Sequence, residues 1–156
     1  MYDLKLVFRI MKIGKKAPDF SLKDGDGNNW KLSEHLGETI ALLFYPGDNT
    51  PVCTKQLCSV RDNWDDYEQT GATIIGVSTD SVDSHKAFIE KHNFPFPLLS
   101  DEGGEVVNQY GVGSWIPGKS ARAVVIIDED GKIKYHKTQS LSLFSPSDDE
   151  VLQAIE

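Results

Sequence analysis

The two cysteines, Cys53 and Cys58, lie five residues apart in the segment of the chain with the clearest chemistry. This segment follows an apolar run and opens a helical pattern, so Cys53 is expected at or near a helix N-terminus. Unpaired backbone N–H groups and the positive end of the helix dipole stabilise an anion there, which favours a thiolate. A thiolate attacks one oxygen of a hydroperoxide, expels the other, and leaves a sulfenic acid. The segment therefore indicates a thiol that can reduce peroxides.

Cys58 is the candidate for the second thiol, which would condense with that sulfenic acid. Five residues of ideal helix give a rise of roughly 7.5 Å and a rotation of about 140°, so the two Cα atoms stand about 8–9 Å apart. A disulfide bridges Cα atoms only within about 7 Å. The helix must therefore unwind locally before the bond forms. Cys53 shares an apolar face with Leu57 and Val60, whereas Cys58 leans toward the polar side.

The loop before Cys53 carries two prolines and a hydroxyl group. Pro46 and Pro51 restrict the backbone of this loop. Thr50 stands three residues before Cys53, and its hydroxyl can accept a hydrogen bond from a bound peroxide or donate one to it. We therefore expect Pro46 and Thr50 to belong to the reactive site.

Other roles for the two thiols stay open on the sequence. Helix cysteines can be inert small apolar residues, and the same scaffold can serve as a redox-inert interaction domain. A general thiol–disulfide oxidoreductase is the nearest rival, but it uses Cys-x-x-Cys, a closer spacing than is found here. A metal site or a histidine-activated cysteine protease would need suitable histidines. The four that are present show no tight cluster, and we expect each to be a surface or structural residue: His35, His85, His92 and His136.

The elements around the cysteines alternate between strands and helices. Expected strands are 39–45, 73–78, 96–99, 123–128 and 133–136; expected helices are 53–70, 81–92, 102–110 and a C-terminal one capped by Ser147. Segments 20–22 and 30–32 flank a turn-rich hexapeptide and predict a hairpin, followed by a short helical turn capped by Ser33. This order predicts an α/β protein. By analogy it is a thioredoxin-like fold, a central mixed sheet flanked by helices, with an added N-terminal β-hairpin.

Length and charge limit the function classes. The chain has 156 residues, the size of one domain, and no repeat or linker divides it. We interpret residues 1–10 as an N-terminal extension and residues 11–156 as a single domain. The net charge of -8 disfavours binding to nucleic acid or to an anionic membrane. No apolar run approaches the roughly 18 residues of a membrane span. Two cysteines without an export signal favour a reducing compartment, and we expect the cytoplasm.

The run Pro46-Gly-Asp-Asn-Thr50-Pro-Val-Cys53 resembles the Pro-x-x-x-Thr/Ser-x-x-Cys signature of the peroxiredoxins. The second cysteine, five residues on, is similar to that of the bacterioferritin-comigratory or peroxiredoxin Q subfamily. The resemblance implies a peroxidase that reduces hydrogen peroxide and organic hydroperoxides without a cofactor. It also implies that Cys58 resolves the sulfenic acid as an intramolecular disulfide. Thioredoxin or a similar dithiol protein would be the reductant, and the protein would be a monomer or weak homodimer.

Peroxiredoxins complete the site with an arginine before an apolar run that ends in Asp, and Arg122-Ala-Val-Val-Ile-Ile-Asp128 fits that pattern. The resemblance therefore implies that Arg122 stabilises the Cys53 thiolate and donates hydrogen bonds to the peroxide oxygens. Arg61, on the cysteine helix, is the fallback, with an ion pair to Asp65 as its structural alternative. Gln56 stands where the subfamily usually has Glu, which predicts a less well oriented arginine and weaker activation of Cys53.

Overall fold

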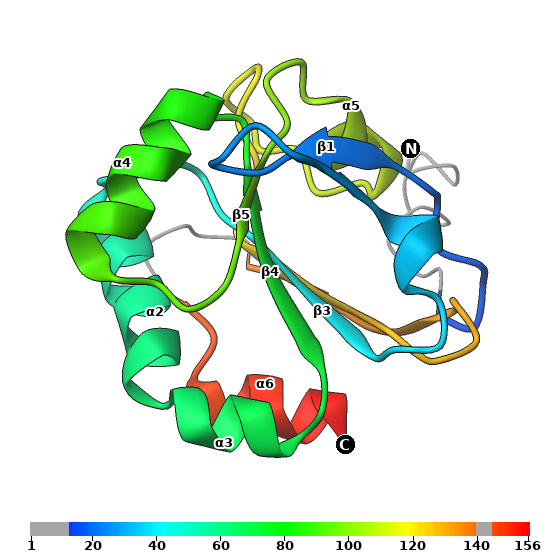
Figure 1. Ribbon diagram of the computed structural model, residues 1–156. Helices are drawn as coiled ribbons and strands as arrows, with labels where there is room; N and C mark the ends of the chain where they lie inside the picture. The colour runs from blue at the N-terminus through cyan, green and yellow to red at the C-terminus, as the bar shows by residue number, and fades with distance from the viewer. Residues whose placement is uncertain (1–12, 140–144) are drawn as a thin grey trace.

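The computed structural model describes residues 13–139 and 145–156 (Figure 1). The extension expected at residues 1–10 lies outside this part of the chain, and the domain boundary at residue 11 stays a prediction. The described residues form a seven-stranded sheet in the order β2-β1-β5-β4-β3-β6-β7. The strands are β1 (Ser21–Lys23), β2 (Asn29–Lys31), β3 (Ile40–Phe44), β4 (Thr73–Ser78), β5 (Leu98–Ser100), β6 (Ala123–Ile127) and β7 (Ile133–Thr138).

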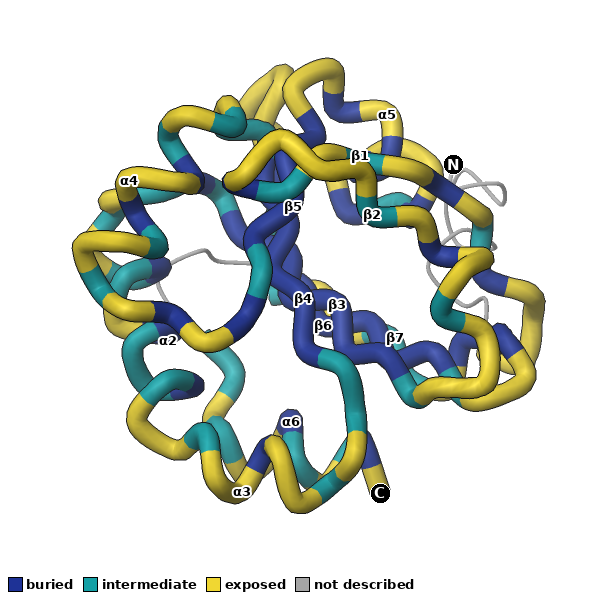
Figure 2. Tube along the Cα trace, in the orientation of Figure 1, coloured by how far each residue is buried: buried dark blue, intermediate teal, exposed yellow. Residues whose placement is uncertain are grey.

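Strand β3 is the centre of the sheet. All five of its residues are buried, as expected of an apolar run covered on both faces. It pairs with β4 in parallel and with β6 antiparallel, and β4 pairs with β5 in parallel. The remaining pairs are antiparallel, including the expected N-terminal hairpin β1–β2. Figure 2 shows β3, β4 and β6 as the dark blue, buried centre of the molecule.

Two helical layers cover the sheet. Helices α2 (Pro51–Asp62), α3 (Trp64–Gln69), α4 (Val82–His92) and α6 (Asp148–Ile155) pack against the face that carries Ala41 and Leu43. The short helix α5 (Glu105–Gln109), the 3-10 helix η1 (Leu32–His35) and the hairpin pack against the face of Leu42 and Phe44. The prediction of an α/β, thioredoxin-like mixed sheet flanked by helices is therefore confirmed. Among the described residues, no helix is long and apolar enough to cross a membrane.

The expected single helix 53–70 is wrong. Helix α2 begins at Pro51 and ends at Asp62, and α3 begins only at Trp64. The break is at Asn63, whose side-chain amide donates to the carbonyl of Ser59 at 2.9 Å and so competes with the helical backbone.

Several other expected boundaries shift by a few residues. Helix α5 starts at Glu105 rather than residue 102, because Gly104 before it adopts a left-handed φ of 71°. The 3-10 helix is preceded by Lys31 rather than capped by Ser33, whose N–H instead donates to Asp19. The cap predicted at Ser147 is confirmed, since its side chain accepts a backbone N–H in the first turn of α6, and Ser81 caps α4 in the same way.

Candidate active site

The loop from β3 to α2 places Cys53 in the first turn of a helix. Asn49 in this loop takes a left-handed φ of 62°, and Thr50 is the extended N-cap residue. Pro51 then begins α2, where a fixed φ suits the first helical position and a missing N–H costs nothing. Cys53 is therefore the third residue of the helix, close to its positive end, as the sequence predicts.

Arg122 lies beside the sulfur of Cys53. Its Nη2 donates to Cys53 Sγ at 3.2 Å, and its Nη1 donates to Oε1 of Gln56 at 2.5 Å. The side chains of Cys53 and Arg122 are both buried, with exposures of 0% and 1%. A charge-assisted bond is stronger in such a dry environment than in water, so the guanidinium stabilises a thiolate.

The register of the sheet brings this arginine to the loop. Phe44 at the end of β3 pairs with Ala123 at the start of β6. Arg122, immediately before β6, therefore lies level with Tyr45, at the point where the reactive loop leaves the sheet. Two segments that are 69 residues apart in the chain meet in this way.

Thr50 and Pro46 lie within the same loop, and both are half-buried. The hydroxyl of Thr50 donates to the carbonyl of Gly47 at 3.1 Å, which closes the loop on itself. Its oxygen keeps the capacity to accept a hydrogen bond from a peroxide. The structure thus brings Arg122 into contact with the sulfur and keeps Thr50 and Pro46 in the segment that leads to it.

Cys58 lies in a different environment from Cys53. Both cysteines are free thiols, but Cys58 is half-buried where Cys53 is buried. The Cys58 sulfur lies 3.7 Å from Nδ1 of His92, at the end of α4. Arg61, the fallback arginine, does not reach Cys53: it pairs with Asp62 rather than the expected Asp65, and it donates to the carbonyl of His92 at 2.7 Å.

A buried ion pair supports the reactive loop, and sequence reasoning missed it. His85 is fully buried; its Nδ1 lies 2.8 Å from Oδ2 of Asp48 and its Nε2 lies 3.0 Å from the carbonyl of Leu99. Both ring nitrogens of this buried histidine therefore face oxygen acceptors. His85, expected to be a surface or a structural residue, is a buried structural one. The recurrence of His85, Phe88 and His92 at helical spacing was the available signal.

The carboxylate of Asp48 is held by several donors. Besides His85, it accepts from the hydroxyls of Tyr45 at 2.6 Å and Ser84 at 2.8 Å. Burial alone would raise the pKa of Asp48, but these hydrogen bonds and the charge of His85 together lower it. The pKa of Tyr45 is raised, mainly by burial and then by the charge of Asp48. The loop is thus tied to β3 and α4 by a charged network.

Asp80 extends this network and approaches the geometry of a cation site. Its Oδ2 accepts from the backbone N–H of Asp48 at 2.8 Å and from Ser78 at 2.6 Å. One ligand atom from each of Asp48, Asp80 and His85 lies within 4.8 Å of the others. In this structure the three residues are joined by hydrogen bonds within the loop network. The cluster is therefore a hydrogen-bonded support for the loop.

A family model described as "AhpC/TSA family" matches residues 13–136, which include both cysteines and Arg122. The chain belongs to the AhpC/TSA family. It is 45% identical to a chloroplastic peroxiredoxin Q of Triticum aestivum over 123 residues, 78% of this chain and 57% of that protein. It is 41% identical to a chloroplastic peroxiredoxin Q of Arabidopsis thaliana over 130 residues, 83% of this chain and 60% of that protein. The chain thus spans less than two thirds of the length of these two relatives.

Solved structures of the family share the fold. Peroxidoxin BcpB from Mycobacterium tuberculosis superposes with a TM-score of 0.83 at 36% identity, over 93% of this chain and 96% of that one. Mycobacterium tuberculosis AhpC superposes with a TM-score of 0.82 at 28% identity, over 94% and 96% of the two chains. The resemblance to the peroxiredoxin Q subfamily, drawn from the cysteine loop, is confirmed.

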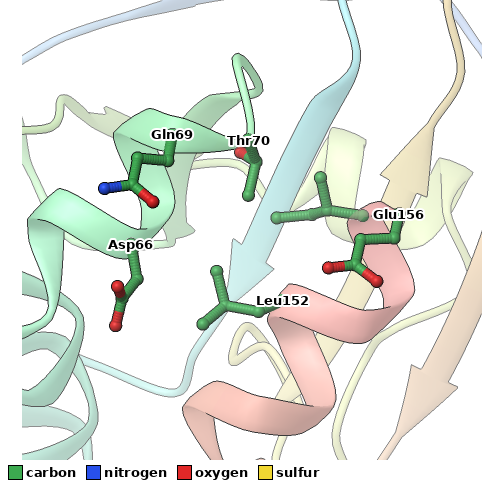
Figure 3. A pocket seen from close by; sticks show the side chains of 6 residues that line it. Asp66, Gln69, Thr70, Leu152 and Glu156 are labelled. Carbon is green, nitrogen blue, oxygen red and sulfur yellow. The ribbon is translucent and has the colours of Figure 1, made fainter.

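A large surface pocket of this AhpC/TSA-family chain lies away from these thiols. It has a volume of about 470 Å³ and lies between α3 and α6 (Figure 3). Its lining includes the carboxylates of Asp66 and Glu156 and the side chain of Leu152, and it contains no thiol, arginine or histidine. It therefore lacks the groups that peroxide reduction requires.

Proposed function

We propose that this protein is a thiol-dependent peroxidase in which Cys53 attacks the hydroperoxide. The observation that carries the proposal is the contact between the guanidinium of Arg122 and the Cys53 sulfur, 3.2 Å apart and buried in the first turn of α2. Helix dipole and guanidinium act together on one sulfur, and both favour its thiolate form. The peroxiredoxin Q relatives support the same reaction.

In the first step the Cys53 thiolate attacks one oxygen of the peroxide. An S–O bond forms, the O–O bond breaks, and the second oxygen leaves as alkoxide or hydroxide and takes up a proton. Negative charge therefore moves from sulfur onto the leaving oxygen, and donors aimed at that position matter most in the transition state. Arg122 supplies two N–H groups on one rigid plane, and Thr50 supplies a hydroxyl to hold the peroxide.

Burial of Cys53 favours a small substrate. Its side chain has 0% exposure, so any substrate reaches the sulfur only after a local movement, which must be far larger for a folded protein disulfide than for a small hydroperoxide. A small hydroperoxide needs only a narrow opening beside the loop. This argues against a general thiol–disulfide oxidoreductase as the primary activity.

In the second step Cys58 attacks the Cys53 sulfenic acid and forms an intramolecular disulfide. The two cysteines are the third and eighth residues of α2, so the first turns of this helix must open for their sulfurs to meet. The opened helix then exposes the disulfide to a thioredoxin-type reductant, which returns both thiols. A monomer or weak homodimer in the cytoplasm stays our prediction.

Counting free thiols after addition of peroxide tests the proposal. The reduced wild-type protein is expected to lose both thiols at equimolar hydrogen peroxide. Cys53→Ser should not consume peroxide, and Cys58→Ser should form one sulfenic acid per chain but lose turnover with thioredoxin. Thiols that respond to disulfides and not to peroxide would favour the oxidoreductase, and thiols that respond to neither would favour the redox-inert domain.

A further inference from the structure

His92 lies next to the second thiol, Cys58. It is the last residue of α4, and the helix ends there because Asn93 takes a left-handed φ of 55°. Its Nδ1 lies 3.7 Å from the Cys58 sulfur, a hydrogen-bonding distance for an atom as large as sulfur. Histidine changes its charge near neutral pH, so it can accept a thiol proton.

The imidazole of His92 packs against two aromatic rings, and a hydrogen bond holds its backbone carbonyl. The ring of Phe88 meets it edge-on, with centroids 5.1 Å apart, and the ring of Phe94 stacks on it at 5.4 Å. The guanidinium of Arg61, on the same helix as Cys58, donates to the His92 backbone carbonyl at 2.7 Å. The contact from Arg61 holds the end of α4 against α2, next to the partly buried contact between Nδ1 and the sulfur.

Charged groups lie beside this contact. Arg61 is the charged group that α2 brings to this contact, and its own ion pair is with Asp62 at 3.0 Å. The pKa of Arg61 is raised, first by its hydrogen bond to Asp62 and in smaller part by the charge of Cys58. On α4 the adjoining charged residues, Glu90 and Lys91, are exposed. The two phenylalanine rings carry no charge.

We propose that His92 accepts the proton of Cys58 and so prepares the second thiol for its attack on the Cys53 sulfenic acid. This role rests on the proposed peroxidase function and adds a positioned base for its second step. The S–H bond of Cys58 breaks and its proton moves to Nδ1. The Cys58 thiolate then forms the S–S bond as the S–O bond of the sulfenic acid breaks, and the departing hydroxide takes a proton to become water. The hydroperoxide has already supplied the oxidation.

Proton transfer precedes the unwinding of α2. Cys58 must leave His92 in order to reach Cys53, whereas His92 stays on α4. An ordinary thiol with a pKa near 8.5 is only about 3% thiolate at pH 7. A base that accepts the proton of the attacking thiol removes this limit, and we expect it to accelerate the second step about tenfold.

Rapid-mixing kinetics separate the two steps. Tryptophan fluorescence is followed after peroxide is mixed with the reduced full-length protein. The first phase depends on peroxide concentration and reports Cys53; the second does not and reports Cys58. In His92→Phe, which keeps an aromatic ring between the two phenylalanines, the second phase should slow about tenfold at pH 7 while the first is unchanged. The deficit should vanish above pH 9, where hydroxide replaces His92 as the base. Lys91→Ala, which removes a neighbouring exposed charge, should behave as wild type.

A second measurement does not depend on peroxidase activity. In the Cys53→Ser background Cys58 is the only cysteine, and its rate of alkylation by iodoacetamide reports its thiolate. His92→Phe should lower that rate about tenfold at pH 7 and leave it unchanged above pH 9. An unaltered alkylation rate at pH 7, or a second phase slowed equally at every pH, would overturn the role of His92. Absence of the first phase in the wild-type protein would instead overturn the proposed function.

Discussion

Gln56 accepts a hydrogen bond from Nη1 of Arg122 at 2.5 Å, while Nη2 of the same guanidinium donates to the Cys53 sulfur at 3.2 Å. Cys53 and Gln56 are three residues apart on α2 and share one face of the helix. The amide orients the arginine without offsetting its positive charge. The expectation that Gln56 leaves the arginine poorly oriented is therefore wrong, since a neutral acceptor orients it. The weaker activation of Cys53 stays a prediction.

Gln56→Leu should release one side of the guanidinium and slow the attack on peroxide. We expect a loss of about tenfold in the second-order rate, or about 1.4 kcal/mol of transition-state stabilisation. Gln56→Glu is the matched variant: it keeps the acceptor and should stay within about threefold of wild type. The rate is measured by rapid mixing with hydrogen peroxide. A Leu variant as fast as wild type would show that Arg122 needs no help from this side chain.

Arg122→Ala should slow the same step by one to three decades, the effect of losing about 1.4 to 4 kcal/mol. Thiolate absorbance at 240 nm in the Cys58→Ser background should also fall at pH 7. Lys55→Ala, which removes an exposed positive charge from the same helix, is the control and should alter neither quantity. Wild-type kinetics and absorbance in Arg122→Ala would contradict the assignment of this residue.

Disulfide formation should unwind α2 and leave α3 folded. Asp148 of α6 accepts hydrogen bonds from Ser59, from Asn63 at 3.0 Å and from Tyr67 at 2.5 Å, which ties the junction of α2 and α3 to the C-terminal helix. Backbone amides of residues 54–62 should therefore exchange with solvent much faster in the oxidised protein, and those of residues 64–69 should stay protected.

Removing the hydrogen bonds to Asp148 should extend the unwinding beyond α2. Asp148→Ala removes the shared acceptor, so the fast exchange of the oxidised protein should spread into α3. Hydrogen exchange with mass spectrometry of both redox states measures each segment. Equal exchange of residues 54–62 in the two states, with the disulfide confirmed, would mean that the sulfurs meet without unwinding the helix.

The buried pair of Asp48 and His85 should make stability depend on acidity. The pKa of Asp48 is lower in the folded protein than its usual value near 3.9. Its contribution is therefore complete above about pH 4 and is lost as pH falls through the lower, folded pKa. Asp48→Asn should cost about 3–5 kcal/mol at pH 7, since it removes one partner of a buried, hydrogen-bonded pair.

Denaturant unfolding between pH 2 and pH 7 measures this effect. As the pH falls below 4, the free energy of unfolding should decrease less steeply in Asp48→Asn than in the wild type. Asp65→Asn, which changes an exposed carboxylate on α3, is the control and should shift stability by less than about 0.5 kcal/mol. A variant at Asp48 that loses no more stability than this control would contradict the charged network.

Local sequence determined the reactive segment and the order of the elements. The spacing of Cys53 and Cys58, the prolines of the loop and the apolar run before it all lie within 20 residues of sequence. The same local signals predicted each strand to within two or three residues. They failed at Asn63, whose side chain donates both to the carbonyl of Ser59 in α2 and to Asp148, 85 positions away.

Only the tertiary structure decided which distant residues meet. The resemblance named Arg122, but the β3–β6 register is what sets its guanidinium against Cys53 and Gln56. Periodicity shows which face of an element is apolar and says nothing about which element covers that face. For this reason His85 and His92 looked like ordinary residues of one helix in the sequence. Because α4 packs against both the loop and α2, His85 pairs with Asp48 and His92 contacts Cys58.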